Sequence, residues 1–140
     1  MTPPLLPEAL PTVLVVDDEV RSQDAMRRTL DEDFTVFTAS SAEEARGLLE
    51  RQPVSVILCD QRMPGVTGVT FLKEVRERWP ETVRIVISGY TDSEDIIAGI
   101  NEAGIYQYIL KPWGPEHLLQ TVRAAAEART LQHGLARLDI

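Results

Sequence analysis

The segment VILCDQRMPG, residues 56–65, changes character at a single position. Its first four residues are apolar and predict a strand buried on both faces of a sheet, where an unpaired carboxylate costs several kcal/mol. We therefore expect Asp60 at the end of that strand, followed by a turn that contains Pro64 and Gly65. At this position the aspartate is either a turn former or the reactive group of a site.

Apolar runs that end on polar residues recur along the chain. TVLVV (residues 12–16) stops at Asp17 and Asp18, and RIVISG (residues 84–89) has the same shape. FTVFTAS (residues 34–40) and YQYIL (residues 106–110) predict two further strands. Helical periodicity fills the intervals, over about residues 20–30, from the cap candidate Ser41 through residue 51, and over residues 69–79, 93–104 and from 115 onward.

Five successive β-α units predict an α/β fold, a doubly wound five-stranded parallel sheet with helices on both faces. In this fold class, ligands bind beyond the carboxyl ends of the strands. Four of the five expected strands end on residues that can take part in chemistry, namely Asp17 with Asp18, Asp60, Ser88 and Lys111. Each alone is more often a turn residue, a cap or a surface charge, but together on one edge they predict a shared site.

The composition fits one domain, because 140 residues with 44% hydrophobic content can bury a substantial core. Residues 1–11 contain four prolines and are expected to form a flexible N-terminal arm. Residues 12–128 form the expected domain. Residues 129–140 are expected to be a helical extension or a linker toward an output domain that this chain does not include.

The charge and the cysteine content exclude some functions. A formal net charge of -8 argues against direct binding of nucleic acid or of an anionic membrane. No apolar segment approaches the roughly 20 residues of a membrane span, and the N-terminus lacks the basic start of a signal peptide. The lone Cys59 is expected to be a small core residue, and its inability to form an internal disulfide suits a cytoplasmic protein.

The expected edge of the sheet carries chemistry typical of phosphoryl transfer. Asp17, Asp18 and Asp60 repel one another when charged unless a cation joins them, and an all-oxygen ligand set is typical of Mg²⁺. Lys111 supplies positive charge for a phosphoryl group, and Ser88 supplies a hydroxyl. Because a carboxylate is a competent nucleophile, Asp60 is the candidate for an aspartyl-phosphate, and we expect its position at the strand end to expose it to solvent.

The segments VLVVDDE, ILCDQRMPGVTG, IVISGYTD and YQYILKPW resemble, in this order, the receiver domain of two-component response regulators over roughly residues 12–128. The resemblance implies the flavodoxin-like (βα)5 receiver fold, phosphorylation by a sensor histidine kinase, and a phosphoacceptor rather than a turnover enzyme. It also implies a role for each matching residue: Asp17 and Asp18 as the acidic pair for Mg²⁺, with Asp18 the direct ligand; Asp60 as phosphoacceptor and metal ligand; the backbone carbonyl of Arg62 as a further metal ligand; Ser88 as the switch hydroxyl; Tyr108 as the switch aromatic; Lys111 as the phosphoryl partner, with a cis bond to Pro112.

Within this family, the sequences of these segments are most similar to those of receivers from nitrogen-regulator-type transcription activators that control hydrogenase synthesis. The resemblance therefore implies a DNA-binding output domain in the full-length chain, controlled by the face of the fourth helix, fifth strand and fifth helix. Receivers of cyclic-dinucleotide phosphodiesterase regulators share the same sequence motifs, so a regulator of that class is an alternative. A second alternative is a receiver-like interaction module that binds partners without phosphorylation.

Two positions depart from the family pattern. Arg62 and Tyr90, which follow the phosphoacceptor and the switch hydroxyl by two residues, are not acids or amides that orient an attacking water. We therefore expect slow self-dephosphorylation. Arg62 also weakens the rival interpretation, an aspartate-nucleophile phosphatase of the haloacid dehalogenase type, because that class needs a second acid at this position.

Two helix faces complete the sequence predictions. Ile96, Ile97 and Ile100 are expected on one apolar stripe of the fourth helix. The fifth helix is expected to continue into the tail, where apolar residues recur at heptad spacing: Ala124, Ala128, Leu131, Leu135 and Leu138. A second copy of the chain is the expected partner of this seam, although Gly134 within it disfavours a helix by roughly 1 kcal/mol.

Overall fold

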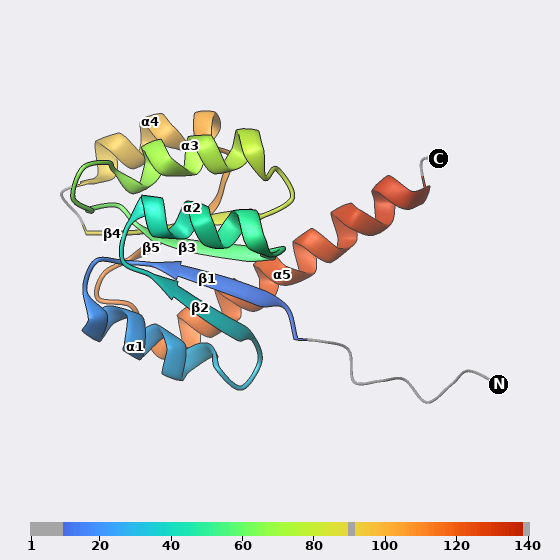
Figure 1. Ribbon diagram of the computed structural model, residues 1–140, viewed down its shortest axis with the longest axis horizontal. Coiled ribbons are helices and arrows are strands. Elements are labelled where there is room, and N and C mark those ends of the chain that lie inside the picture. Colours follow the sequence, from blue (N-terminus) through green and yellow to red (C-terminus); the bar gives the residue numbers. More distant parts are fainter. Residues whose placement is uncertain (1–9, 90–91, 139–140) are drawn as a thin grey trace.

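The computed structural model describes residues 10–89 and 92–138, without the side chains of residues 93, 95 and 131–138. Five parallel strands form one sheet in the order β2-β1-β3-β4-β5 (Figure 1). The order reverses between β1 and β3, so the carboxyl ends of these two strands flank the crevice where such sheets bind ligands. The strands are β1 (Thr12–Val16), β2 (Thr35–Ala39), β3 (Val56–Asp60), β4 (Val83–Ser88) and β5 (Ile105–Leu110).

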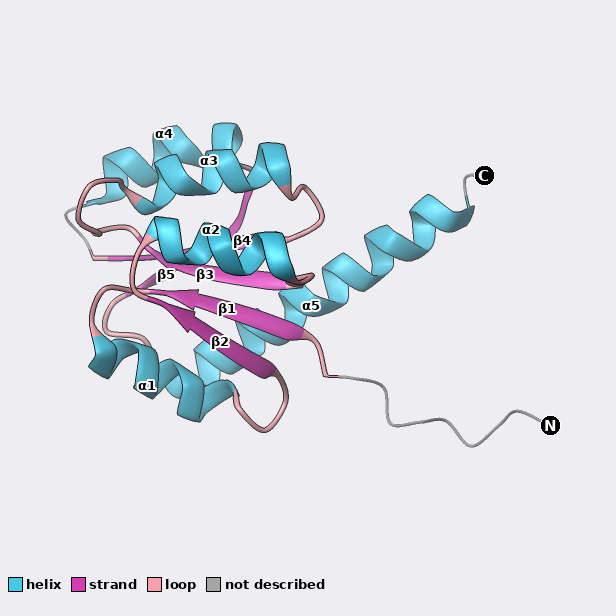
Figure 2. Cartoon of the chain, viewed as in Figure 1, coloured by secondary structure: helices cyan, strands magenta, loops and turns pink. Residues whose placement is uncertain are grey.

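Helices follow each strand and cover both faces of the sheet, as Figure 2 shows. This is the doubly wound α/β fold that the alternation of β and α patterns predicted, and the predicted element boundaries agree with the observed ones to within one or two residues. The helices are α1 (Val20–Leu30), α2 (Ala42–Arg51), α3 (Gly68–Arg78), α4 (Ser93–Ala103) and α5 (Pro115–Leu138).

Two hydrophobic cores lie on opposite faces of the sheet. One core joins the sheet to α2, α3 and α4, and its largest fully buried side chains include Phe71 and Leu72 of α3. The other joins the sheet to α1 and α5 through residues such as Met26 and Leu118. Because all five residues of β3 are buried, this central strand is apolar until it reaches Asp60, as the sequence indicated.

Local sequence explains the start of α2 and the end of α4. Ser41 caps α2, because its side chain accepts a hydrogen bond from the backbone N–H of Glu44 at 3.1 Å. Gly104 ends α4 with φ +59, a left-handed conformation that glycine adopts readily. The predicted stripe on α4 is wrong at one residue: Ile96 is buried and Ile100 packs against the core, but Ile97 is 70% exposed, since it lies about 100° farther round the helix.

The last helix is the longest and projects beyond the sheet (Figure 1). Leu118, Val122 and Ala125 pack into the core, whereas Ala124 is exposed and Ala128 is half-buried. The helix then continues to Leu138, so the backbone of the tail is helical up to that residue. The side chains of Leu131, Leu135 and Leu138 lie outside the described part of the chain, as does most of the N-terminal arm.

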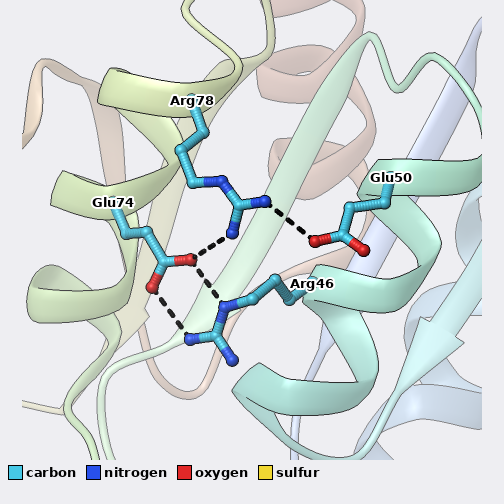
Figure 3. A network of polar contacts seen from close by, with 4 residues as sticks. All are labelled: Arg46, Glu50, Glu74 and Arg78. Carbon is cyan, nitrogen blue, oxygen red and sulfur yellow. Dashed lines mark hydrogen bonds and ion pairs between the residues drawn. The ribbon is translucent and has the colours of Figure 1, made fainter.

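An ion-pair network joins α2 to α3 on the outside of the sheet (Figure 3). Arg46 donates two hydrogen bonds to the carboxylate of Glu74, at 2.6 and 2.8 Å. Arg78 pairs with the same carboxylate at 3.1 Å and with Glu50 at 2.8 Å. The network contains two arginines and two glutamates, so its charges balance within the protein.

Candidate phosphoryl and metal site

Three carboxylates meet at the carboxyl ends of β1 and β3. Asp17, Asp18 and Asp60 each offer one oxygen such that these oxygens lie within 4.8 Å of one another. The parallel register explains the meeting, because Val16 of β1 lies beside Cys59 of β3 and the next residue of each strand is an aspartate. Asp18 is exposed, but Asp60 is only 5% exposed, which corrects the expectation that a strand-end aspartate would lie open to solvent.

Lys111 is the positive partner of this cluster. Its ammonium group lies 2.9 Å from Oδ1 of Asp60, and its backbone N–H donates to the carbonyl of Ser88 at 2.8 Å. Partial burial acts to lower the pKa of Lys111, but the hydrogen bond and charge of Asp60 outweigh it, so the pKa is raised and the lysine stays charged. The bond from Lys111 to Pro112 is cis, as the family resemblance implied.

Asp17 is electrostatically the least satisfied of the three acids. Its Oδ1 accepts a hydrogen bond from the backbone N–H of Glu19 at 2.9 Å, but its buried Oδ2 has no hydrogen-bond partner. Burial raises the pKa of Asp17, and repulsion from Asp60 and Asp18 acts in the same direction. A buried carboxylate oxygen without a partner is costly, so this oxygen indicates a ligand.

The donor set fits a small hard dication. Three carboxylates facing one lysine leave an excess of negative charge, and Mg²⁺ prefers carboxylate oxygens together with water. The orphan oxygen of Asp17 and the exposed carboxylate of Asp18 are both available to it. An open cavity of about 520 Å³ adjoins the site and is lined by Asp18, Gln61, Arg62, Met63, Thr67 and Asp92, among others.

Ser88 lies on β4, which pairs with β3, and Tyr108 lies on β5, the next strand of the sheet. Ser88 is buried at the end of β4, one residue beyond the position that pairs with Asp60. Tyr108 lies on β5 beside Val86, and its side chain is 44% exposed. The sheet therefore brings Ser88 to the same edge as Asp60 and Lys111, whereas Tyr108 lies farther back on β5 and faces outward.

Gln23 of α1 is a residue of the site that the sequence did not reveal. Its buried side-chain amide donates to the backbone carbonyl of Asp17 at 2.6 Å and to the hydroxyl of Ser40 at 3.0 Å. It therefore ties the loop that carries Asp17 and Asp18 to the end of β2. The sequence offered no signal for it, since a glutamine on a helix is usually a surface residue.

Gly68 and Gln61 fix the loop after the candidate phosphoacceptor. A Cβ on Gly68 would lie 2.5 Å from the backbone oxygen of Asp60, so only glycine fits there. The backbone N–H of Gly68 donates to the carbonyl of Gln61 at 2.9 Å, and the side chain of Gln61 accepts from the N–H of Val69. Glycine after a turn was the available signal for Gly68, but the sequence did not show which backbone it approaches.

Arg62 and Cys59 complete the neighbourhood. Arg62 donates to the carboxylate of Asp92 at 2.9 Å across the cavity. Cys59 is fully buried, and burial raises the pKa of its thiol well above the usual range, which agrees with the prediction that it is a core residue. Tyr90, the second residue expected to influence dephosphorylation, lies outside the described residues.

The comparisons with known proteins indicate one family. Residues 13–123 match the response regulator receiver domain family. The chain is 80% identical over 129 residues to the hydrogenase transcriptional regulatory protein HoxA of Cupriavidus necator, covering 92% of this chain and 27% of that protein. The HoxA of Bradyrhizobium diazoefficiens is 62% identical over 121 residues, covering 86% of this chain and 25% of that protein.

A solved structure supports the same fold. The crystal structure of the signal receiver domain of an HD domain-containing protein from Pseudomonas fluorescens Pf-5 superposes with a TM-score of 0.87 and 28% identity, covering 93% of this chain and 96% of that one. The chain therefore belongs to the response regulator receiver domain family. It spans about a quarter of the length of the two curated relatives.

None of the helices in the described residues is both long and apolar enough to cross a bilayer.

Proposed function

We propose that Asp60 accepts a phosphoryl group from a phosphohistidine on a sensor histidine kinase. A carboxylate oxygen of Asp60 forms a bond to phosphorus while the phosphorus–nitrogen bond breaks, and the electron pair of that bond returns to the imidazole. The observation that carries the proposal is the Asp60 carboxylate held 2.9 Å from the Lys111 ammonium beside two further acids. Lys111 is placed to stabilise the charge of the transferred group.

We propose that Mg²⁺ is held by the carboxylates of Asp17, Asp18 and Asp60 and by the backbone carbonyl of Arg62. The ion when bound neutralises charge on the phosphoryl oxygens. The orphan Oδ2 of Asp17 supports this assignment, because ligation gives that buried oxygen the partner that it lacks in the protein alone. The N–H of Glu19 and the amide of Gln23 hold Asp17 in place.

Ser88 and Tyr108 are the proposed switch residues. The Ser88 hydroxyl moves toward the phosphoryl group, and the outward side chain of Tyr108 turns inward, which changes the face formed by α4, β5 and α5. Three large exposed hydrophobic residues belong to the elements of this face, namely Ile97 of α4 and Tyr106 and Tyr108 of β5. Such residues are typical of a surface that changes partners.

We propose that the switched face controls a transcription output domain in a longer protein, as in a regulator of hydrogenase synthesis. The 80% identity to a hydrogenase transcriptional regulatory protein supports this choice. The alternatives are a receiver of a cyclic-dinucleotide phosphodiesterase regulator and an interaction module that is not phosphorylated. If the chain belongs to a transcription regulator, its direct partners are the kinase and the output domain. Only the output domain then contacts DNA.

Incubation with Mg²⁺ and a small phosphodonor, followed by intact mass measurement, tests the proposal. We expect a single phosphoryl adduct that requires Mg²⁺ and is absent from the Asp60→Asn variant. A phosphatase instead releases phosphate continuously, and a non-phosphorylated interaction module gives no adduct. An undiminished adduct in Asp60→Asn would show that the chemistry occurs at another residue.

We further propose that the tail of α5 pairs with a second copy of the chain. The helix continues from Ala125, its last residue in the buried core, to Leu138, and the sequence carries apolar residues at heptad spacing along this length. Deletion of residues 130–140 is expected to lower the mass in solution from a dimer to a monomer. An unchanged mass would remove the tail from the assembly.

A further inference from the structure

Asp92 occupies the N-cap position of α4, but its side chain does not cap the helix. Aspartate is favoured at this position because its carboxylate accepts an orphan N–H of the first turn. Here Oδ2 of Asp92 accepts from the backbone N–H of Gly89 at 3.2 Å, and Oδ1 accepts from Nε of Arg62 at 2.9 Å. The first turn of α4 therefore lacks the cap that its own sequence provides.

Arg62 reaches Asp92 from a different loop. It follows Asp60 by two residues, so the ion pair connects the loop of the proposed phosphoacceptor to the loop that leads into α4. The side chain of Asp92 is 8% exposed, whereas that of Arg62 is 69% exposed. A buried carboxylate needs a partner, but an exposed guanidinium can change partners without disturbing the packing.

Arg62 also lines the cavity that adjoins the acidic cluster. Asp18, Arg62 and Asp92 line the same cavity, and Arg62 is only two residues from Asp60 along the chain. In the structure, Arg62 donates to a carboxylate oxygen of Asp92, and a phosphoryl group on Asp60 would add about two negative charges two residues before Arg62 in the chain. A guanidinium can bind a phosphoryl group through two parallel, charge-assisted hydrogen bonds.

We propose that Arg62 exchanges Asp92 for the phosphoryl group when Asp60 is phosphorylated, an inference that rests on the function proposed above. Asp92 then turns to cap the first turn of α4. The exchange links the charge at the end of β3 to the position of α4 through two named side chains. In the phosphorylated state the guanidinium also covers the phosphoryl group and slows its hydrolysis.

The test compares Arg62→Gln with a matched control, Lys73→Gln. Lys73 of α3 pairs with Glu102 of α4, so the control also removes an ion pair to α4, but at the opposite end of the helix. We expect Arg62→Gln without any phosphoryl group to shift the backbone amide signals of Gly89 and Glu94. The shift should follow the direction that beryllium trifluoride with Mg²⁺ produces in the wild type. Lys73→Gln should leave these two signals in place.

Decay of the phosphoryl adduct, followed by intact mass, is the second readout. We expect the adduct of Arg62→Gln to decay about fivefold faster than that of the wild type, at the lower end of the coupling between two sites, with Lys73→Gln unchanged. If the adduct of Arg62→Gln decays at the wild-type rate and its amide signals do not shift, the proposed exchange of Asp92 for the phosphoryl group is wrong. A wild type that takes no adduct would instead overturn the proposed function, so the two failures are distinct.

Discussion

The ion-pair network between α2 and α3 and the cluster at the end of β3 are both groups of four charged side chains. In the network, two arginines face two glutamates, and Glu74 accepts three hydrogen bonds (Figure 3). In the cluster, three aspartates face Lys111, and one buried oxygen of Asp17 has no partner. A group whose charges balance internally has a structural role, whereas a group left with excess charge and an orphan oxygen indicates a ligand.

The largest expected effect on stability comes from a substitution that disturbs the loop after Asp60. Gly68→Ala should lower the free energy of unfolding by about 2 to 3 kcal/mol, because the new Cβ would lie 2.5 Å from the backbone oxygen of Asp60. Gly47→Ala on α2, beside the network, is the matched control. Apart from its chain neighbours and the backbone of its own helix, no atom of the described residues lies within 4 Å of its new Cβ, so this change should raise stability by about 0.5 to 1 kcal/mol. Urea unfolding measures both, and equal effects would contradict the close approach at Gly68.

Neutralising an acid in the cluster should stabilise the protein when no divalent cation is present. Asp17→Asn keeps an oxygen for the N–H of Glu19 and removes the repulsion from Asp60, so we expect a gain of about 1 kcal/mol in a chelating buffer. Saturating Mg²⁺ should stabilise the wild type more than this variant, because the variant has lost a ligand. If the variant is less stable than the wild type in a chelating buffer, the claim that excess negative charge in the cluster destabilises the protein is wrong.

The same kind of change in the network should have the opposite sign. Glu74→Gln breaks the paired hydrogen bonds from Arg46 and leaves two arginines against one acid. Because the pair is partly exposed, we expect a loss of no more than about 1 kcal/mol at neutral pH and low salt, reduced at high salt. If Glu74→Gln stabilises the protein, the proposed difference between the ion-pair network and the acidic cluster is wrong.

Acid should remove this smallest effect. The hydrogen bond from Arg46 holds the pKa of Glu74 below its usual value, although partial burial opposes it. A lowered folded-state pKa means that the stabilisation is present above the unfolded-state pKa and is lost as the pH falls through the folded-state pKa. The difference between wild type and Glu74→Gln should therefore shrink toward zero in acid. Unfolding curves at several pH values check this, and a difference that grows in acid would contradict it.

Most of the fold follows from local pattern. The apolar runs ending in Asp17, Asp60 and Ser88 predicted three strands, and Ser41 predicted the start of α2. Ile97 was misplaced because neighbouring apolar residues on a helix point in directions about 100° apart, and residue type alone does not show which of them reaches the core. The exposed position of Ile97 depends on how α4 packs on α3, which is a tertiary property.

The site was only partly visible in the sequence. Strand-end position was enough to gather Asp17, Asp18, Asp60 and Lys111, since parallel strands bring their carboxyl ends to one edge. Gln23, Gly68 and Asp92 could not be found in this way. Their roles depend on contacts with backbone or side chains 6 to 30 positions away, and their residue types are ordinary in helices and turns.

The most direct test of the account is to identify the residue that carries the phosphoryl group. An acyl phosphate is reduced by borohydride, which converts an aspartyl-phosphate to homoserine, and peptide mass mapping then locates the change. After treatment with phosphodonor and Mg²⁺, we predict homoserine at position 60 and no change at position 17 or 18. Homoserine at another aspartate, or none in a protein that carries the adduct, would contradict the assignment of Asp60 as the phosphoacceptor.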